Sequence, residues 1–113
     1  MSDCIFCDIV RGEASASIVY QDDDVTVFHD LHPQAPVHLL VVPNRHIVDL
    51  SQIEEEDGPE LARLFVVARR LAEEMGVADG FRVVVNSGPE AGQSVFHLHM
   101  HVLGGRRMNW PPG

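Results

Sequence analysis

The chain has 113 residues, 45% of them apolar and 22% charged, which is the composition of one globular domain spanning residues 1–113. Seventeen acidic residues against eight basic ones give a net charge of −9, which argues against a nucleic-acid partner, because binding to a phosphate backbone needs clustered Lys and Arg. No apolar run approaches the roughly 20 residues of a membrane helix, and the first residues lack the basic and apolar regions of a signal peptide, so we expect a cytoplasmic protein without a membrane partner.

The first motif is a Cys-x-x-Cys pair, Cys4 and Cys7, on a segment that is predicted to be a short helix over residues 4–11, ended by Gly12. Two cysteines are half of a four-ligand zinc site. The alternative is two small, buried apolar side chains, and the segment alone leaves both open. A structural disulfide is disfavoured in a reducing compartment, and a thioredoxin-like motif would follow a strand, which is not predicted here.

Three strand-like segments follow, at residues 18–20, 25–28 and 38–42. The acidic run over residues 21–24 suits a hairpin turn between the first two strands. The third strand is expected to end at Pro43, because proline lacks the amide hydrogen that a strand ladder uses.

One long helix is predicted after the third strand. Asp57 or Gly58 can cap its start, and Gly76 suits its exit, while Pro59 suits the first turn. Apolar residues at three- and four-residue spacing form one stripe: Leu61, Leu64, Phe65, Ala68, Leu71, Ala72 and Met75. Val66 falls outside this stripe, either as an incidental exposed residue or as part of a second contact, such as one with another subunit.

Two further strands are predicted at residues 81–85 and 94–103. Strands, then a long helix, then strands indicate the α+β class. We expect a mostly antiparallel five-stranded sheet, with the long helix on one face and a short N-terminal helix.

Three histidines, His97, His99 and His101, alternate with apolar residues in the last strand. On a strand they would form a row on one face, opposite four apolar side chains: Phe96, Leu98, Met100 and Val102. Imidazole acts as nucleophile, acid, base or metal ligand near neutral pH. A histidine-rich surface strand is the alternative, but histidines placed at the strand period favour a functional site.

The loop before these histidines suits an anion. Gly92 permits backbone conformations that bring N–H groups close to a ligand, and Ser94 adds a hydroxyl. Most Gly-Gln-Ser loops are plain turns, so this interpretation depends on the adjacent histidines. A deprotonated imidazole can attack phosphorus and form a phosphohistidine that water hydrolyses, and His99, flanked by a histidine on each side, is the predicted nucleophile.

The pattern over residues 97–103 resembles the signature of the histidine triad (HIT) family of nucleotide hydrolases and transferases. The similarity extends over essentially the whole chain and includes residues 4–7, 28–30, 33–38, 92–94 and 108–113. The Trp-Pro-Pro-Gly ending resembles the branch called histidine triad nucleotide-binding proteins.

By this resemblance, His99 carries the transient nucleoside monophosphate. His101 and Ser94 would contact the phosphate or the leaving group. His38 corresponds to a fourth active-site histidine, and its alternative is a satisfied polar residue that opens a strand.

The resemblance also implies a nucleotide-binding set. Asp30 would accept hydrogen bonds from the ribose hydroxyls, and Leu31 would adjoin the base. The phosphate side would be held by the backbone of two loop residues and by one amide side chain: Gly92, Gln93 and Asn86.

Metal-binding members of the family pair the cysteines with two histidines, which here are His46 and His97. With Cys4 and Cys7 they would make a closed structural zinc site. Zinc is optional in the family, and we expect no catalytic metal.

The resemblance thus implies a hydrolase that cleaves the P–N bond of purine nucleoside 5′-phosphoramidates, such as AMP-amines. One alternative is a dinucleoside polyphosphate hydrolase, and another is a nucleotide-sensing or scaffold protein with incidental turnover. The resemblance further implies a two-fold homodimer, with long helices and adjacent strands at the interface and Trp110 near the partner's active site. The alternative is that Trp110 packs on its own subunit.

Overall fold

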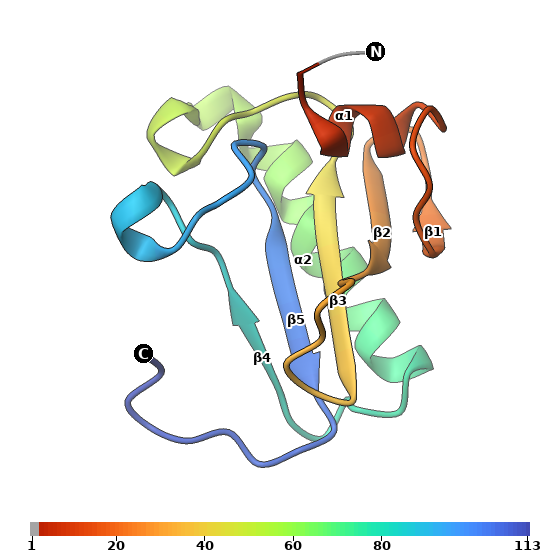
Figure 1. The fold of residues 1–113 in the computed structure, drawn as a ribbon, viewed down its shortest axis with the longest axis vertical. Coiled ribbons are helices and arrows are strands. Elements are labelled where there is room, and N and C mark those ends of the chain that lie inside the picture. The colour runs from red at the N-terminus through yellow and green to blue at the C-terminus, as the bar shows by residue number, and fades with distance from the viewer. Residues whose placement is uncertain (1–2) are drawn as a thin grey trace.

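In the computed structural model, which describes residues 3–113, five strands form one antiparallel sheet in the order β1-β2-β3-β5-β4 (Figure 1). The strands are β1 (Ile18–Gln21), β2 (Val25–His29), β3 (Val37–Pro43), β4 (Phe81–Val84) and β5 (Met100–Gly104). The helices are α1 (Ile5–Val10), α2 (Gly58–Glu74) and three short 3-10 turns at Leu50–Gln52, Glu55–Asp57 and Pro89–Ala91. This confirms the predicted α+β fold. Within the described residues, no helix is long and apolar enough to cross a membrane.

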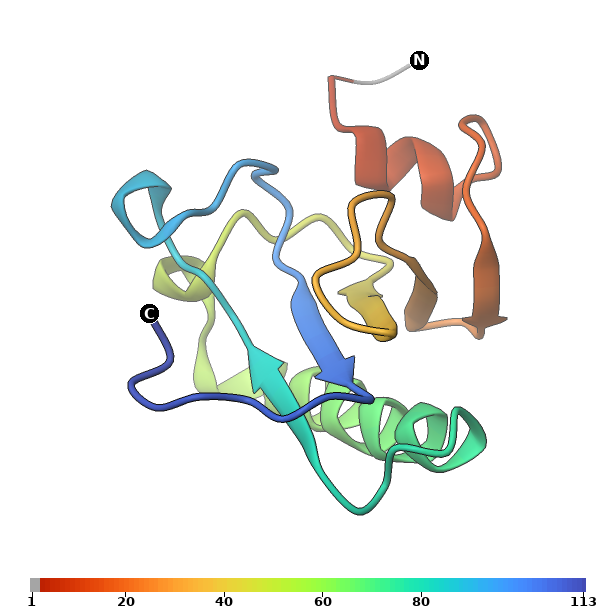
Figure 2. The same cartoon turned by 60° about the horizontal axis from the view of Figure 1, so that its bottom comes forward.

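The two helices cover opposite faces of the sheet, as Figure 2 shows. The cluster between the sheet and α2 contains Val25, Val27, Leu39, Val41, Leu64, Val67, Ala68, Leu71, Met100 and Val102. The smaller cluster on the α1 side contains Phe6, Ile9, Phe28, Leu40 and Val42. Alternate residues of β3 serve the two clusters, because successive side chains of a strand point to opposite faces. Since Leu40 pairs with His101 across β3 and β5, His101 projects to the α1 face.

The long helix ends where the sequence predicts, but its buried face is centred differently. Phe65, predicted to lie in the apolar stripe, is 60% exposed, whereas Val67 is fully buried. Phe65 lies about 100° around the helix from the buried Leu64, at the margin of the stripe. Val66, which the sequence placed outside the stripe, is 44% exposed.

The last strand begins later than predicted. β5 starts at Met100, so only His101 of the three histidines lies in a strand. His97 and His99 precede the strand in an irregular segment. The prediction of one strand over residues 94–103 is therefore wrong for the part before Met100.

Pro43 gives the physical reason for this late start. Continuing the register of β3 and β5 would bring Leu98 opposite Pro43, which has no amide hydrogen to donate. The carbonyl of Pro43 instead accepts a hydrogen bond from the ring Nε2–H of His97, and the Leu98 amide donates to the Ile47 carbonyl over 2.6 Å. Phe96, expected on the apolar face of the predicted strand, lies outside β5 and is 47% exposed.

The loop between β2 and β3 closes against the end of β5. Gly105 has a φ of 92°, and a Cβ built there would lie 2.9 Å from the Cβ of Pro36. Next to it, Arg106 Nε donates to the carbonyl of Gln34 over 2.9 Å. These contacts hold the residues just before His38 close to the sheet.

We predict that Gly105→Ala destabilises the protein by about 2 kcal/mol or more, because alanine is strained at positive φ and would collide with Pro36. Gly80→Ala is the matched control, since Gly80 has no positive φ and an added Cβ would meet no atom within 4 Å. Its effect should stay within about 1 kcal/mol. Urea-induced unfolding measures both free energies, and equal midpoints for the two variants would contradict this packing.

Candidate active site and metal centre

The imidazole of His97 is fully buried and has a fixed orientation. Its Nε2–H donates to the carbonyl of Pro43 over 2.8 Å. A carbonyl only accepts, so we assign the ring hydrogen to Nε2, and Nδ1 keeps a lone pair for a metal ion. Burial lowers the pKa of His97, which keeps this imidazole neutral at pH 7.

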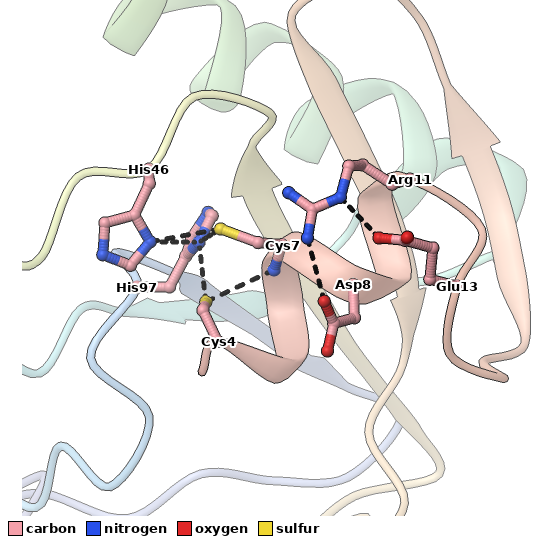
Figure 3. Close-up of polar contacts among 7 residues, drawn as sticks. All are labelled: Cys4, Cys7, Asp8, Arg11, Glu13, His46 and His97. Atoms are coloured by element: carbon pink, nitrogen blue, oxygen red, sulfur yellow. Dashed lines mark hydrogen bonds and ion pairs between the residues drawn. The ribbon is translucent and has the colours of Figure 1, made fainter. Parts of the chain in front are cut away.

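Three side chains from two other segments, Cys4, Cys7 and His46, converge on the ring of His97 (Figure 3). His97 Nδ1 lies 3.4 Å from Cys4 Sγ and 3.5 Å from Cys7 Sγ. His46 Nδ1 lies 3.2 Å from Cys7 Sγ and 3.3 Å from His97 Nδ1. A tetrahedral zinc ion separates its sulfur and nitrogen ligands by about 3.6 Å and two nitrogen ligands by about 3.3 Å, given Zn–S and Zn–N bonds of about 2.3 and 2.05 Å. The four predicted ligands therefore fit one zinc ion.

Helix α1 brings the two cysteines together. Cys4 caps the helix, and its Sγ accepts the amide hydrogen of Cys7 over 3.3 Å. Burial and the neighbouring Cys4 raise the pKa of Cys7 to about 11. A divalent cation would oppose this shift, because coordination favours the thiolate. Two sulfurs and two imidazoles are a donor set that suits zinc.

His99, the predicted nucleophile, is held by the main chain two residues before it. Its Nδ1–H donates to the carbonyl of His97 over 2.7 Å. The ring of Phe6 meets the His99 ring edge-on, with centroids 5.1 Å apart. Because the hydrogen sits on Nδ1, Nε2 keeps its lone pair, and within residues 3–113 it makes no hydrogen bond.

His38 and His101 form a linked pair. The amide of Gln34 donates to His38 Nδ1 over 2.9 Å, which places the hydrogen of His38 on Nε2. That Nε2–H donates to His101 Nδ1 over 2.9 Å. His101 therefore carries its own hydrogen on Nε2. It presents a donor next to His99, whose ring centroid is 5.1 Å away.

Both imidazoles of this pair are neutral at pH 7. Burial, and then the neighbouring His99 and His38, lower the pKa of His101 to about 4. Burial also lowers the pKa of His38, and the nearby Asp30 carboxylate opposes this shift. Neutral rings are what the hydrogen-bond pattern requires, because a protonated His38 could not accept from the Gln34 amide.

A second group of metal-ligand types, Asp30, His38 and His101, lies on the same face of the sheet. Asp30 Oδ2 is 3.4 Å from His38 Nε2, and Asp30 Oδ1 accepts the His32 amide hydrogen over 2.8 Å. A metal ion would need the lone pair of His38 Nε2, but the Gln34 amide fixes a hydrogen on that atom. We interpret this group as a chain of hydrogen bonds rather than as a metal site.

A cavity of about 400 Å³ lies between α1 and the sheet. Its apolar wall includes Ile5, Phe6, Ile9, Phe28, Leu31 and Leu40. Its polar side brings together six of the predicted site residues: Asp30, Asn86, Gly92, Ser94, His99 and His101. His38 does not line this cavity but contacts two residues that do, His101 and Asp30.

The sequence analysis did not identify the α1 wall of this cavity. Ile5 and Phe6 lie within the Cys-x-x-Cys motif, and Ile9 follows four residues after Ile5. The four-residue spacing of Ile5 and Ile9 was the one sequence feature that pointed to this wall, because residues four apart share a helix face. A short apolar face usually packs against a core, so the pattern alone does not indicate a ligand.

The loop before the histidines differs in detail from the expected phosphate cradle. Gly92 does adopt a positive φ, of 97°. However, the amides of Gly92 and Gln93 donate to the carbonyls of Pro89 and Gly88 over 3.0 and 3.2 Å. The buried Gln93 side chain braces the loop, since its Oε1 accepts the Gly88 amide hydrogen and its Nε2 donates to the carbonyl of Val48.

The side chains of Asn86 and Ser94 are polar groups of this region that could still bind a ligand. Within the described residues, neither the amide of Asn86 nor the hydroxyl of Ser94 makes a hydrogen bond, and both line the cavity. They line the same cavity as His99 and His101. The lining therefore includes three residues with unpaired donors, together with His99 and its unpaired Nε2.

Comparisons with known proteins identify the family of this chain. The HIT domain model matches residues 11–108. The chain is 49% identical to an uncharacterized HIT-like protein of Synechocystis sp., over 98% of this chain and 97% of that one. It is also similar to the crystal structure of a HIT family hydrolase from Legionella pneumophila, with a TM-score of 0.97 and 42% identity over 98% of this chain and 100% of that one.

A Zn-bound histidine triad family protein from Mycobacterium smegmatis is also similar, with a TM-score of 0.80 and 34% identity over 96% of this chain and 78% of that one. The sheet order, the long helix and the short N-terminal helix are thus those of HIT family hydrolases. With a family model that matches residues 11–108 and a relative 49% identical over almost the whole length, this chain belongs to the HIT family.

Proposed function

We propose that this protein is a purine nucleoside phosphoramidase of the histidine triad nucleotide-binding branch. It hydrolyses the P–N bond of nucleoside 5′-phosphoramidates through a covalent nucleotidyl-histidine on His99. One observation carries this proposal: the Nδ1–H of His99 is tied to a main-chain carbonyl, and its unpaired Nε2 lies among unpaired donors in one cavity.

The cavity suits a nucleoside monophosphate unit. Pockets of about 300–1,000 Å³ hold small organic ligands, and this one is about 400 Å³. Its apolar wall, with Phe6 and Leu31, can hold a flat purine ring. The carboxylate of Asp30 can accept hydrogen bonds from the ribose hydroxyls. The phosphate would then lie at the end of the cavity that contains His99.

Neutral donors would hold the phosphate. The amide of Asn86, the hydroxyl of Ser94 and the Nε2–H of His101 can each donate to a phosphoryl oxygen. No arginine of the described residues lines the cavity. The site therefore offers hydrogen bonds aimed at the reacting group instead of a concentrated positive charge.

The reaction needs two displacements at phosphorus. The lone pair of His99 Nε2 attacks phosphorus, the P–N bond breaks, and the amine leaves with the bonding electrons and takes up a proton from solvent. The positive charge on the nucleotidyl-imidazole is stabilised because its Nδ1–H donates to the carbonyl of His97. Water then attacks phosphorus and gives a proton to solvent, and the bond between phosphorus and His99 Nε2 breaks, which releases the nucleoside monophosphate and restores neutral His99.

Zinc is the proposed metal of the centre formed by Cys4, Cys7, His46 and His97. The interatomic distances fit a tetrahedral site, and a similar protein is Zn-bound. Neither Cys4 nor Cys7 is in a disulfide bond, which is compatible with the proposed cytosolic location.

We also propose a two-fold homodimer. Phe65 and Val66 expose apolar surface on α2, and β4 is an edge of the sheet. Trp110 is 82% exposed within one chain, which contradicts the alternative that it packs on its own subunit. Arg82 donates to the carbonyl of Asn109 over 2.8 Å and so holds the tail beside β4. An isologous contact would cover these surfaces on both copies.

The first prediction concerns the nucleophile. His99→Ala should lower kcat/KM for adenosine 5′-phosphoramidate by roughly 10⁴-fold or more, because no other group can form the covalent intermediate. Its affinity for AMP, measured by calorimetry, should change by only about threefold, because the donors and Asp30 remain. His99→Gly with added imidazole should regain part of the activity.

Turnover of His99→Ala near the wild-type rate would refute this role. A wild-type protein that binds AMP but does not turn over phosphoramidates repeatedly would favour the nucleotide sensor or scaffold. Faster hydrolysis of dinucleoside polyphosphates than of phosphoramidates would favour the other hydrolase branch.

The second prediction concerns zinc. Protein purified without chelator should contain about one zinc ion per chain by elemental analysis, as one closed four-ligand site requires. Cys4→Ser and Cys7→Ser should lower the zinc content and the melting temperature, because the metal joins distant segments. Arg11→Ala is the matched control, because Arg11 lies at the end of α1 but is not one of the four ligands, and this variant should retain zinc. A metal-free wild type with unchanged stability in both serine variants would support buried apolar cysteines instead.

The third prediction concerns assembly. Light scattering at low micromolar concentration should give the mass of two chains, and Phe65→Asp should shift it toward one chain by placing a charge in the contact. A chain ending at Arg107 should keep its AMP affinity but change its preference among amine leaving groups, since it lacks Trp110. A monomeric wild type, or an unchanged preference, would contradict this assembly.

A further inference from the structure

The segment that carries the nucleophile is not part of a strand. His97 and His99 precede β5, so no strand ladder fixes their backbone. Two hydrogen bonds attach the segment to the last residue of β3 and to the chain after it: His97 Nε2–H to the Pro43 carbonyl and the Leu98 amide to the Ile47 carbonyl, at 2.8 and 2.6 Å. The position of His99 therefore depends on how residues 43–47 and 97–99 are held together.

The metal centre lies across the same junction. His46 belongs to the first of these two segments and His97 to the second, and their Nδ1 atoms are 3.3 Å apart. An ion bound by both would add a bond between the two segments that is much stronger than either hydrogen bond. The junction that holds His99 thus coincides with the junction that the metal closes.

A second connection runs through α1. Phe6 lies between Cys4 and Cys7 and packs edge-on against the rings of His97 and His99, with centroids 5.9 and 5.1 Å away. Coordination of the two thiolates would fix α1, and with it this ring, against the nucleophile.

We propose that the metal centre positions His99 for attack, so that metal occupancy regulates the active site. This inference rests on the proposed function of His99. His97 is the positioning residue, because its ring faces the metal ligands while its carbonyl holds the Nδ1–H of His99 at 2.7 Å. Loss of the metal would let residue 97 turn, which would release the His99 ring and remove the constraint that keeps the lone pair on Nε2.

The first test follows the Nδ1–H of His99 by NMR, with the imidazole signals assigned through His99→Gln. We expect its exchange with water to rise about tenfold or more when a chelator removes zinc, and to return when zinc is added back. Ladder amides such as that of Val102 are the internal reference and should not change. An equally protected His99 Nδ1–H in zinc-loaded and zinc-free protein would overturn the proposal.

If the chelator unfolds the chain, two variants of the exposed ligand His46 test the same proposal without a chelator. His46→Cys retains a zinc-binding side chain and should preserve the protected Nδ1–H, whereas His46→Ala, at saturating zinc, should lose it. Equal protection in the two variants would also overturn the proposal, because His46 does not itself contact His99.

Kinetics separate positioning from simple stabilisation. Below the melting temperature, His46→Ala should lower kcat roughly tenfold to a hundredfold while KM changes by about twofold or less, since a misplaced nucleophile affects the chemical step. A centre that only stabilises the fold would lower the melting temperature and leave kcat unchanged. If the zinc-loaded protein does not hydrolyse phosphoramidates at all, the proposed function fails, and the NMR comparison still decides whether the metal positions His99.

Discussion

The site depends on main-chain atoms that pair with one ring nitrogen in each of three histidines, His97, His99 and His38. The carbonyl of Pro43 accepts from His97, the carbonyl of His97 accepts from His99, and the amide of Gln34 donates to His38. Each bond decides which ring nitrogen carries the hydrogen. One residue type thus supplies the proposed metal ligand, the proposed nucleophile and, through the His38–His101 pair, a hydrogen-bond donor. Neutral rings are essential to this division, and burial lowers the pKa values of His97, His38 and His101 accordingly.

Much of this arrangement could be predicted from the sequence. The strand at Val37–Pro43 and the helix at Gly58–Glu74 follow from strong local signals, namely a β-branched apolar run ended by proline and a capped amphipathic stripe. The histidines and cysteines were identified because those residue types are uncommon and regularly spaced. The grouping of Cys4, Cys7, His46 and His97 came from the family resemblance, because residue type and spacing alone indicated only the two cysteines as half of a site.

What the sequence did not predict depends on long-range packing. The late start of β5 follows from a pairing partner, Pro43, which lies far away in the chain. The Gln93 side chain donates to the carbonyl of Val48, and Phe65 is exposed on α2. Both features depend on neighbouring segments that a periodic pattern cannot specify. Alternation at the strand period suggested three equivalent histidines in a row, whereas their environments differ because only His101 continues the ladder.

The break before β5 is itself useful to the chemistry. In a regular ladder the carbonyl of residue 97 would accept an amide hydrogen from the neighbouring strand. Outside the ladder it is available to accept the Nδ1–H of His99, a side-chain-to-backbone bond between residues two apart. The same break lets the ring of His97 reach Pro43 and face the metal ligands. A proline at the end of β3 therefore leaves the carbonyl and the ring of His97 outside the ladder, where they can join the proposed metal centre to the proposed nucleophile, His99.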